Sequence, residues 1–148
     1  MIVFFGTSRH SAQFLEQIVQ NGLKIDLVVS SSPKPVGKDQ VLTENPTVTA
    51  AKKFGLPFIT SINELSPTMK QCNNLTIGLI LDYNIIIPQE TINLFSKGII
   101  NIHFSKLPQY RGSSPVQYTI LNGDKIAWIT YYLIDEKIDT GKIIAQTS

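Results

Sequence analysis

The chain has 148 residues, 43% hydrophobic and 16% charged, which is the composition of one folded domain rather than a disordered segment. Its net charge of +2 argues against a protein whose main task is to coat nucleic acid. The single cysteine, Cys72, excludes an internal disulfide framework and a cysteine-rich zinc site. No apolar run approaches the roughly 18 residues of a membrane span. No basic stretch precedes the apolar start either, so we expect a cytoplasmic protein without a signal peptide.

The first half of the chain alternates apolar runs with amphipathic segments. A continuous apolar run is typical of a strand buried on both faces, and apolar residues three and four positions apart indicate a helix. Glycines follow the amphipathic segments at the points where a helix should stop. These patterns predict strands at Met1–Phe5, Ile25–Val29 and Pro57–Thr60, and helices at Ala12–Gln20 and Thr47–Phe54.

A polar stretch from Ser30 to Pro46 interrupts this alternation. It contains Pro33, Pro35 and Gly37 and shows no periodicity. Because it is longer than an ordinary connection, we expect an irregular loop that is either functional or mobile.

The second half of the chain shows the same alternation of apolar runs and amphipathic segments. Its patterns predict strands at Leu75–Leu81, Ile99–His103, Ile126–Ile134 and Lys142–Gln146, and helices from Pro88 to Phe95 and from Pro115 to Gly123, the latter capped by Ser114. We interpret Trp128 and the Tyr131–Tyr132 pair as strand packing. Strands alternating with helices predict an α/β protein, with a Rossmann-like, mostly parallel sheet covered by helices on both faces. We expect one domain spanning residues 1–148.

Ligands of such sheets bind outside the carboxyl ends of the strands. Five polar segments follow predicted strands, namely Gly6–Ser8, Ser30 onward, Asp82–Asn84, Asn101–Ser105 and Asp135–Gly141. The first of these lacks the glycine fingerprint that a nucleotide-binding dehydrogenase needs.

Asn101 and His103 end the strand that begins at Ile99. Alternation places both side chains on the same face, about 7 Å apart along the chain. An amide and an imidazole aimed together can donate hydrogen bonds to a developing oxyanion, and the imidazole can also shuttle a proton. The alternative is that both side chains satisfy loop backbone at the strand end.

The acidic segment Asp135–Gly141 also allows two interpretations. Asp135, Glu136 and Lys137 fit a solvated turn. Asp139 differs, because the turn at Thr140 can hold its side chain inward. A carboxylate near His103 would orient the imidazole and stabilise its charged form.

Two further polar residues have ordinary alternatives. Arg111 lies in a proline- and glycine-containing loop that leads into a helix, where it either binds an anion or is a surface arginine. His10 fits a surface or capping residue near the first helix.

Four segments together resemble the signatures of the folate-dependent formyltransferases. The run from Asn101 to Gly112 resembles the family's Asn-x-His strand end and its Ser-Leu-Leu-Pro-x-Tyr-Arg-Gly loop. The run from Asp135 to Ile144 resembles the partner signature Asp-x-Gly-x-Asp-Thr-Gly-x-Ile. Val3–Thr7 and Tyr83–Pro88 resemble two further family segments, so the resemblance extends through the chain in order.

The resemblance implies a role for each matching residue. Asn101 and His103 would hold the formyl oxygen and stabilise the oxyanion, and Asp139 would pair with His103 and take up the amine proton through water. The co-substrate would be 10-formyltetrahydrofolate, without a metal. Its contacts are expected from Ser105, Lys106, Leu107 and Pro108, and from a pterin pocket at Leu81, Tyr83, Ile87, Ile138, Thr140 and Gly141.

Within the family the chain most resembles the branch that formylates methionyl-tRNA. Gly112–Tyr118 resembles the helix entry of that branch, Pro33–Lys38 resembles its inserted loop, and Pro46–Val48 resembles the start of the helix after that loop. Initiator methionyl-tRNA would then be the partner, with acceptor contacts expected at Gly6, Thr7, Lys34, Lys38 and Arg111. Lys34 and Lys38 are offset by nearby acidic residues, so a solvated connector is the alternative for this stretch.

Three positions depart from the family pattern. Lys106 replaces a leucine, and Asn84 and Lys137 stand where glycine is common. The sequence stops at Ser148, just after the Asp-Thr-Gly strand, so we expect a catalytic domain truncated at its C-terminus and lacking the tRNA-binding domain. Two alternatives stay open: an amino-sugar nucleotide as the acceptor, and a folate-binding module without turnover.

Overall fold

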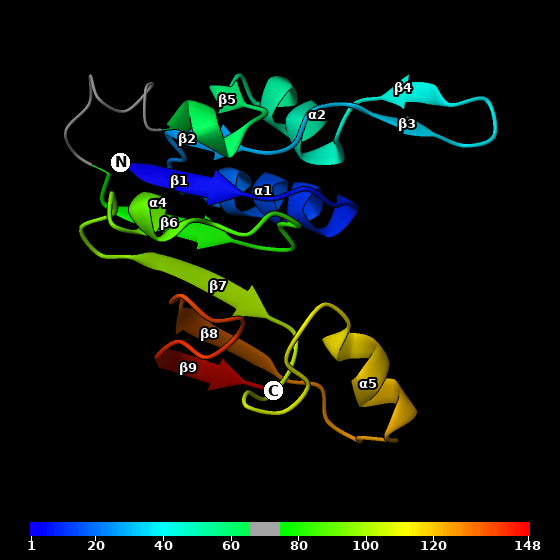
Figure 1. Cartoon of the computed structure of the whole chain (residues 1–148), viewed down its shortest axis with the longest axis vertical. Helices are drawn as coiled ribbons and strands as arrows, with labels where there is room; N and C mark the ends of the chain where they lie inside the picture. The colour runs from blue at the N-terminus through cyan, green and yellow to red at the C-terminus, as the bar shows by residue number, and fades with distance from the viewer. Residues whose placement is uncertain (66–74) are drawn as a thin grey trace.

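The computed structural model describes residues 1–65 and 75–148, and Cys72 lies outside these ranges. A seven-stranded sheet with the order β5-β2-β1-β6-β7-β8-β9 forms the body of the chain (Figure 1). Its strands are β1 (Ile2–Phe5), β2 (Leu27–Val29), β5 (Phe58–Ile59), β6 (Ile77–Ile80), β7 (Ile99–His103), β8 (Ile129–Leu133) and β9 (Ile143–Thr147).

The sheet is parallel from β5 to β7 and antiparallel from β7 to β9. Phe4 of β1 pairs with Val28 of β2 and with Leu79 of β6, and Ile80 of β6 pairs with Asn101 of β7. Strand β8 then runs antiparallel to β7, and β9 antiparallel to β8. The prediction of a mostly parallel α/β sheet is therefore confirmed.

Helices cover both faces of the sheet, as predicted. They are α1 (Arg9–Gln20), α2 (Pro46–Lys53) and α4 (Gln89–Ile92). A further helix, α5 (Pro115–Leu121), is largely exposed, and a short 3-10 turn spans Ile62–Glu64. Alternation along β1 sends Phe4 into a core cluster that includes Leu15 of α1 and Ala51 of α2. The opposite cluster contains Val3 and Phe5 of the same strand together with Ile92 of α4. None of the helices within the described residues is long and apolar enough to span a membrane.

The helix predicted from Pro88 to Phe95 is shorter than expected. Regular helix ends at Ile92, because Leu94 and Phe95 donate their backbone N–H groups three residues back, to Thr91 and Ile92. Such bonds tighten the last turn and end the helix. Helix α5 begins at Pro115 after Ser114, as the sequence predicts.

The polar stretch before α2 is the largest departure from the expected structure. Instead of an irregular loop it contains a two-stranded antiparallel hairpin, β3 (Lys34–Val36) and β4 (Val41–Thr43). Gly37 has a positive φ of 76° and Gln40 one of 49°, which allows the tight reversal between the strands. The hairpin extends away from the main sheet (Figure 1).

Candidate active site

Asn101 and His103 lie on β7, which pairs in parallel with β6 on one side and antiparallel with β8 on the other. Asn101 pairs with Tyr132 of β8 and His103 pairs with Thr130, whereas the intervening Ile102 faces the core on the α1 side. The two predicted side chains therefore share one face of the sheet, as alternation requires. His103 is only 6% exposed.

The imidazole of His103 has two polar neighbours. Its Nε2 lies 2.9 Å from the carbonyl oxygen of Tyr110, and its Nδ1 lies 3.9 Å from Oδ2 of Asp139. A carbonyl only accepts, so the contact with Tyr110 requires a proton on Nε2. In the neutral ring Nδ1 then carries no proton, and the ion pair with Asp139 forms when both nitrogens are protonated.

Asp139 is held in place by two short hydrogen bonds. Its Oδ2 accepts the backbone N–H of Gly112 at 2.6 Å, and its Oδ1 accepts the hydroxyl of Tyr132 at 2.6 Å. The residue is 8% exposed and has a positive φ of 54°. A buried carboxylate needs such donors because they replace the water that it has lost. The structure thus brings Asp139 to His103, but Tyr132 and Gly112 make the direct hydrogen bonds.

The path by which Asp139 reaches His103 differs from the one that the sequence suggested. Because β8 is antiparallel, its carboxyl end at Leu133 lies beside Ile100, near the start of β7 rather than its end. The 134–142 segment folds back from there, and Asp139 approaches His103 across the face of the sheet. Gly141 is essential to this return, because a Cβ at that position would lie 1.7 Å from the carbonyl oxygen of Leu133.

Tyr132 is the site residue that sequence reasoning missed, since it was interpreted as strand packing. It is 2% exposed, and its hydroxyl also accepts a hydrogen bond from Nδ2 of Asn101 at 2.8 Å. Burial raises the pKa of Tyr132 well above its usual value. No sequence signal marks this role, because the position of Tyr132 opposite Asn101 depends on the register of β8 against β7.

The loop that follows His103 is anchored to β8 and β9. Thr130 donates its hydroxyl to the carbonyl of Ser105 at 2.6 Å and accepts the N–H of Leu107 at 3.1 Å. The amide of Gln146 donates to Thr130 and to the carbonyl of Leu107. Ser105 in turn donates to the carbonyl of Gln109 at 2.6 Å. Buried backbone groups of this loop are therefore satisfied by side chains of the adjacent strands.

Three predicted binding residues of this loop are exposed, namely Lys106, Pro108 and Arg111. The ammonium of Lys106 lies 4.3 Å from the centre of the Trp128 ring, which is a cation–π contact. Trp128 precedes β8 rather than lying within it.

The residues that follow β1 and β6 meet at the carboxyl edge of the sheet. Thr7 donates its N–H and its hydroxyl to the carbonyl of Asp82, and accepts the N–H of Asn84. Gly6 has no space for a side chain, because a Cβ there would lie 2.4 Å from Cβ of Ser11. His10, expected at the surface, is exposed and lies 3.7 Å from the carboxylate of Asp82.

The residues expected to line a pterin pocket have different environments. The side chains of Leu81 and Ile87 are buried in the two core clusters, whereas Ile138 is exposed. Tyr83 packs edge-on against Phe5, and burial raises the pKa of its hydroxyl to about 12. That hydroxyl is buried and has no hydrogen-bond partner among the described residues.

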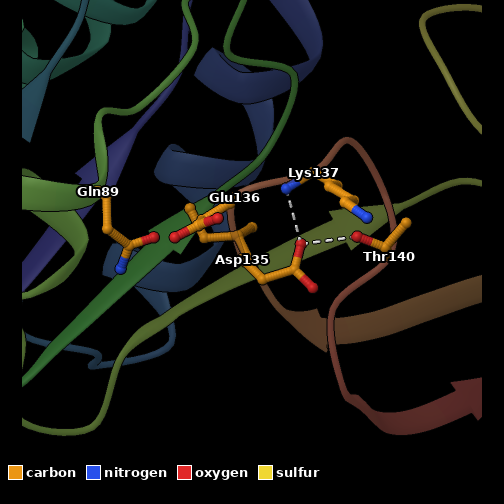
Figure 2. Close-up of a pocket in the computed structure, with 6 residues that line it drawn as sticks. Gln89, Asp135, Glu136, Lys137 and Thr140 are labelled. Carbon is orange, nitrogen blue, oxygen red and sulfur yellow. Dashed lines mark hydrogen bonds between the residues drawn. The ribbon is translucent and has the colours of Figure 1, made fainter.

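An open hollow of about 590 Å³ lies beside the 134–140 turn. Its lining consists of Gln89, Ile134, Asp135, Glu136, Lys137 and Thr140, so of the expected folate contacts only Thr140 borders it within the described residues (Figure 2). The hydroxyl of Thr140 and the N–H of Lys137 donate to Asp135 and hold the pKa of that carboxyl below its usual value. Within residues 1–65 and 75–148, no group of three His, Cys, Asp or Glu side chains gathers that could hold a metal ion.

Lys34 and Lys38 are separate from this cluster, since both lie on the β3–β4 hairpin and are exposed. Lys34 borders a second hollow of about 250 Å³, together with Ser31, Ser32, Val36, Thr43, Glu44, Asn45 and Pro46. The base of the hairpin is tied to the sheet edge, because Asn45 donates to the carbonyl of Thr7 at 2.9 Å.

Comparisons with known proteins identify the family of the chain. The family model for formyl transferase matches residues 1–148. Methionyl-tRNA formyltransferases of Buchnera aphidicola subsp. Baizongia pistaciae and Thermodesulfovibrio yellowstonii are 40% and 34% identical over 99% and 98% of this chain. The chain covers 47% and 48% of those two proteins, so it spans about half the length of the curated relatives it matches.

Solved structures share the fold. The phosphoribosylglycinamide formyltransferase of Anaplasma phagocytophilum matches 98% of this chain and 69% of its own, with a TM-score of 0.77 and 22% identity. An N-formyltransferase of Helicobacter canadensis, in complex with folinic acid and dTDP-3-aminofucose, matches 99% of this chain and 51% of its own, with a TM-score of 0.68 and 26% identity. By sequence along its full length and by fold, the chain belongs to the formyl transferase family.

Proposed function

We propose that this chain is the catalytic part of an enzyme that transfers a formyl group from 10-formyltetrahydrofolate to the amine of methionyl-tRNA. The observation that carries the proposal is the convergence of Asn101, His103 and Asp139 on one face of the sheet. An amide that is linked to a buried carboxylate through the hydroxyl of Tyr132, and an imidazole within ion-pair distance of that carboxylate, fit acyl transfer through an oxyanion.

In the proposed reaction, Asn101 and His103 stabilise the formyl oxygen as it becomes negative. Nδ2 of Asn101 carries a second N–H besides the one given to Tyr132. His103, protonated on both nitrogens, keeps its bond to Tyr110 and offers the N–H of Nδ1 to the oxyanion. The carboxylate of Asp139, 3.9 Å away, stabilises the charge on the ring.

In this scheme Asp139 accepts a proton from the amine and returns it to the leaving nitrogen. The neutral amine forms a bond to the formyl carbon, and the bond between that carbon and N10 of the folate then breaks. The proton that the attacking amine loses passes through water to Asp139 and finally to N10, which leaves as an N–H group. One proton therefore moves from the amine to N10, and Asn101, His103 and Asp139 end in the protonation states in which they began.

The acceptor is inferred from the relatives. Both sequence relatives described above are named methionyl-tRNA formyltransferases, and charged tRNA is found in the cytoplasm, where we place this protein. An amino-sugar nucleotide is the second candidate, because the Helicobacter canadensis structure of the same fold contains dTDP-3-aminofucose.

The test is formyl transfer from 10-formyltetrahydrofolate to methionyl-tRNA, with amino-sugar nucleotides in parallel. We expect turnover on methionyl-tRNA, and a loss of at least about a hundredfold in His103→Ala, as for other oxyanion donors. His10→Ala is the matched control, because His10 is an exposed helix residue. Absence of turnover on every acceptor, in a folded sample that binds folate, would instead favour a binding module without catalysis.

A further inference from the structure

We propose that Tyr132 is a positioning residue that couples the two ends of this site, by orienting the amide of Asn101 and holding the carboxylate of Asp139 through one phenolic hydroxyl. The inference rests on the proposed function, since it assigns Tyr132 a part in the same reaction. Tyr132 itself contacts neither the formyl group nor the amine in this scheme, so it acts through its two neighbours.

The direction of the hydrogen bonds follows from the chemistry of the three groups. An ionised carboxylate only accepts, so the single proton of the Tyr132 hydroxyl is committed to Oδ1 of Asp139 at 2.6 Å. The hydroxyl can then only accept from Asn101, whose side-chain atom 2.8 Å away must be the nitrogen Nδ2. The charge of Asp139 thus determines which side of the Asn101 amide carries the donor.

This orientation is what the proposed oxyanion site requires. An amide rotated by 180° would present its oxygen, which would repel a developing oxyanion. Because Tyr132 accepts one N–H of Asn101, the second N–H of the same nitrogen is left for the substrate.

Asp139 is restrained by the same contact. Tyr132 occupies Oδ1 and the N–H of Gly112 occupies Oδ2, so the carboxylate cannot rotate without losing a short hydrogen bond. Oδ2 is also the atom that lies 3.9 Å from His103. The tyrosine therefore keeps the carboxylate edge turned toward the imidazole.

The surroundings favour a protonated, immobile hydroxyl. Tyr132 is 2% exposed and lies opposite Asn101 in the β7–β8 register. Burial raises the pKa of Tyr132, so the phenol keeps its proton at neutral pH. The neighbouring Tyr131 pairs with Ile102 and packs on the opposite face.

The kinetic test compares Tyr132→Phe with Tyr131→Phe, the same change on the other face. Tyr132→Phe is expected to lower kcat by about ten- to a hundredfold, which is the range for residues that orient a reacting residue by a hydrogen bond. The KM for the folate should change by less than about twofold. Tyr131→Phe is expected to leave both constants near wild type. An unchanged kcat in Tyr132→Phe would overturn the proposal.

A double-mutant cycle separates positioning from a general loss of stability. In an Asn101→Ala background the effect of Tyr132→Phe should shrink, because the part that acts through the amide is already lost. The same fold-change in both backgrounds would show that Tyr132 does not act through Asn101.

A measurement without turnover keeps this inference distinct from the proposed function. The side-chain amide signals of Asn101, assigned with Asn101→Ala, should show one proton protected from exchange in wild type and in Tyr131→Phe, and neither protected in Tyr132→Phe. If that proton stays protected in Tyr132→Phe, then Tyr132 does not orient the amide of Asn101, even if the enzyme is active. If no acceptor is formylated by wild type, the proposed function fails, and the amide signals alone decide whether Tyr132 orients Asn101.

Discussion

Two polar, proline-containing segments of this chain are ordered in opposite ways. The 104–114 loop has no regular structure, yet the hydroxyl of Thr130 and the amide of Gln146 bind its backbone from the adjacent strands. The β3–β4 hairpin has regular pairing, but all six of its strand residues are exposed, and Leu42 is 68% exposed. Regular secondary structure is therefore a poor guide to which segment is held firmly; side-chain hydrogen bonds from the core are the better one.

The difference has a physical origin in where each backbone finds its partners. The hairpin pairs Lys34 with Thr43 and Val36 with Val41, and its outer edges are exposed to water, so its backbone needs no partner from the sheet. The loop satisfies its groups through Thr130, which is fully buried. Perturbing the loop should consequently affect the whole domain, whereas perturbing the hairpin should remain local.

The largest contrast is expected between a glycine of the 134–142 segment, whose Asp139 binds the loop at Gly112, and a glycine of the hairpin. Gly141→Ala places a Cβ against the carbonyl of Leu133, so we expect a loss of about 3 kcal/mol in the free energy of unfolding, or displacement of the turn that carries Asp139. Gly37→Ala, with open space around it and a φ of 76°, should cost only about 1 kcal/mol of backbone strain. Urea unfolding measures both, and equal losses would contradict the contrast.

Matched threonine substitutions come next. Thr130→Val leaves the N–H of Leu107 and the carbonyl of Ser105 without their partner, which should cost about 2 kcal/mol. Thr43→Val removes one exposed bond to Val41, and the expected change is within about 0.5 kcal/mol. Chemical denaturation of the two variants side by side gives the answer. If Thr130→Val leaves the free energy of unfolding unchanged, the loop does not depend on the hydroxyl of Thr130.

A smaller effect should appear only at alkaline pH. Burial raises the pKa of Tyr83 to about 12 and raises that of Tyr132 further, whereas an unfolded tyrosine ionises near 10. Above pH 10 the unfolded chain therefore loses protons that the folded one retains, so the contribution of these two tyrosines to the free energy of unfolding should be constant below pH 10 and fall from there toward pH 12. Tyr83→Phe should flatten this fall. The hairpin contains no tyrosine, so its removal should leave the profile unchanged.

The smallest effect on stability is expected from excising the hairpin. Replacing residues 34–43 by a short glycine–serine connection should change the free energy of unfolding by less than about 1 kcal/mol. If methionyl-tRNA is the acceptor, KM for the tRNA should rise while folate affinity stays constant, because Lys34 and Lys38 are removed. A loss of folate binding would mean that the hairpin supports the site after all.

Much of the fold could be predicted because the buried strands are continuous apolar runs, which can be recognised in the sequence. The apolar run of β1 and the Asn-x-His end of β7 predicted strands at the observed places, and alternation along β7 placed Asn101 and His103 on one face. The hairpin was missed because Pro35 weakens a strand pattern. A proline is tolerated there only because each of these two strands pairs on one side alone.

The roles of Tyr132 and Thr130 could not be read from sequence for a different reason. Both belong to an apolar strand in which tyrosine and threonine are common for packing alone. Their hydroxyl bonds depend on the antiparallel register of β8 against β7, which brings Tyr132 opposite Asn101 and Thr130 opposite His103. Register between strands separated by a helix is a property of the folded sheet, and no local pattern encodes it.

The hydrogen bonds of Gln146 to the 104–114 loop and to Thr130 also have a consequence for the order of folding during translation. Gln146 donates to the carbonyl of Leu107 at 3.0 Å and to Thr130 at 2.9 Å, across 39 and 16 positions of the chain. A ribosome must therefore extrude β9 before the loop behind His103 has all of its anchors. The parallel strands β1, β2, β5, β6 and β7 all precede β8 and β9 in the chain, so they leave the ribosome before the residues that anchor this loop.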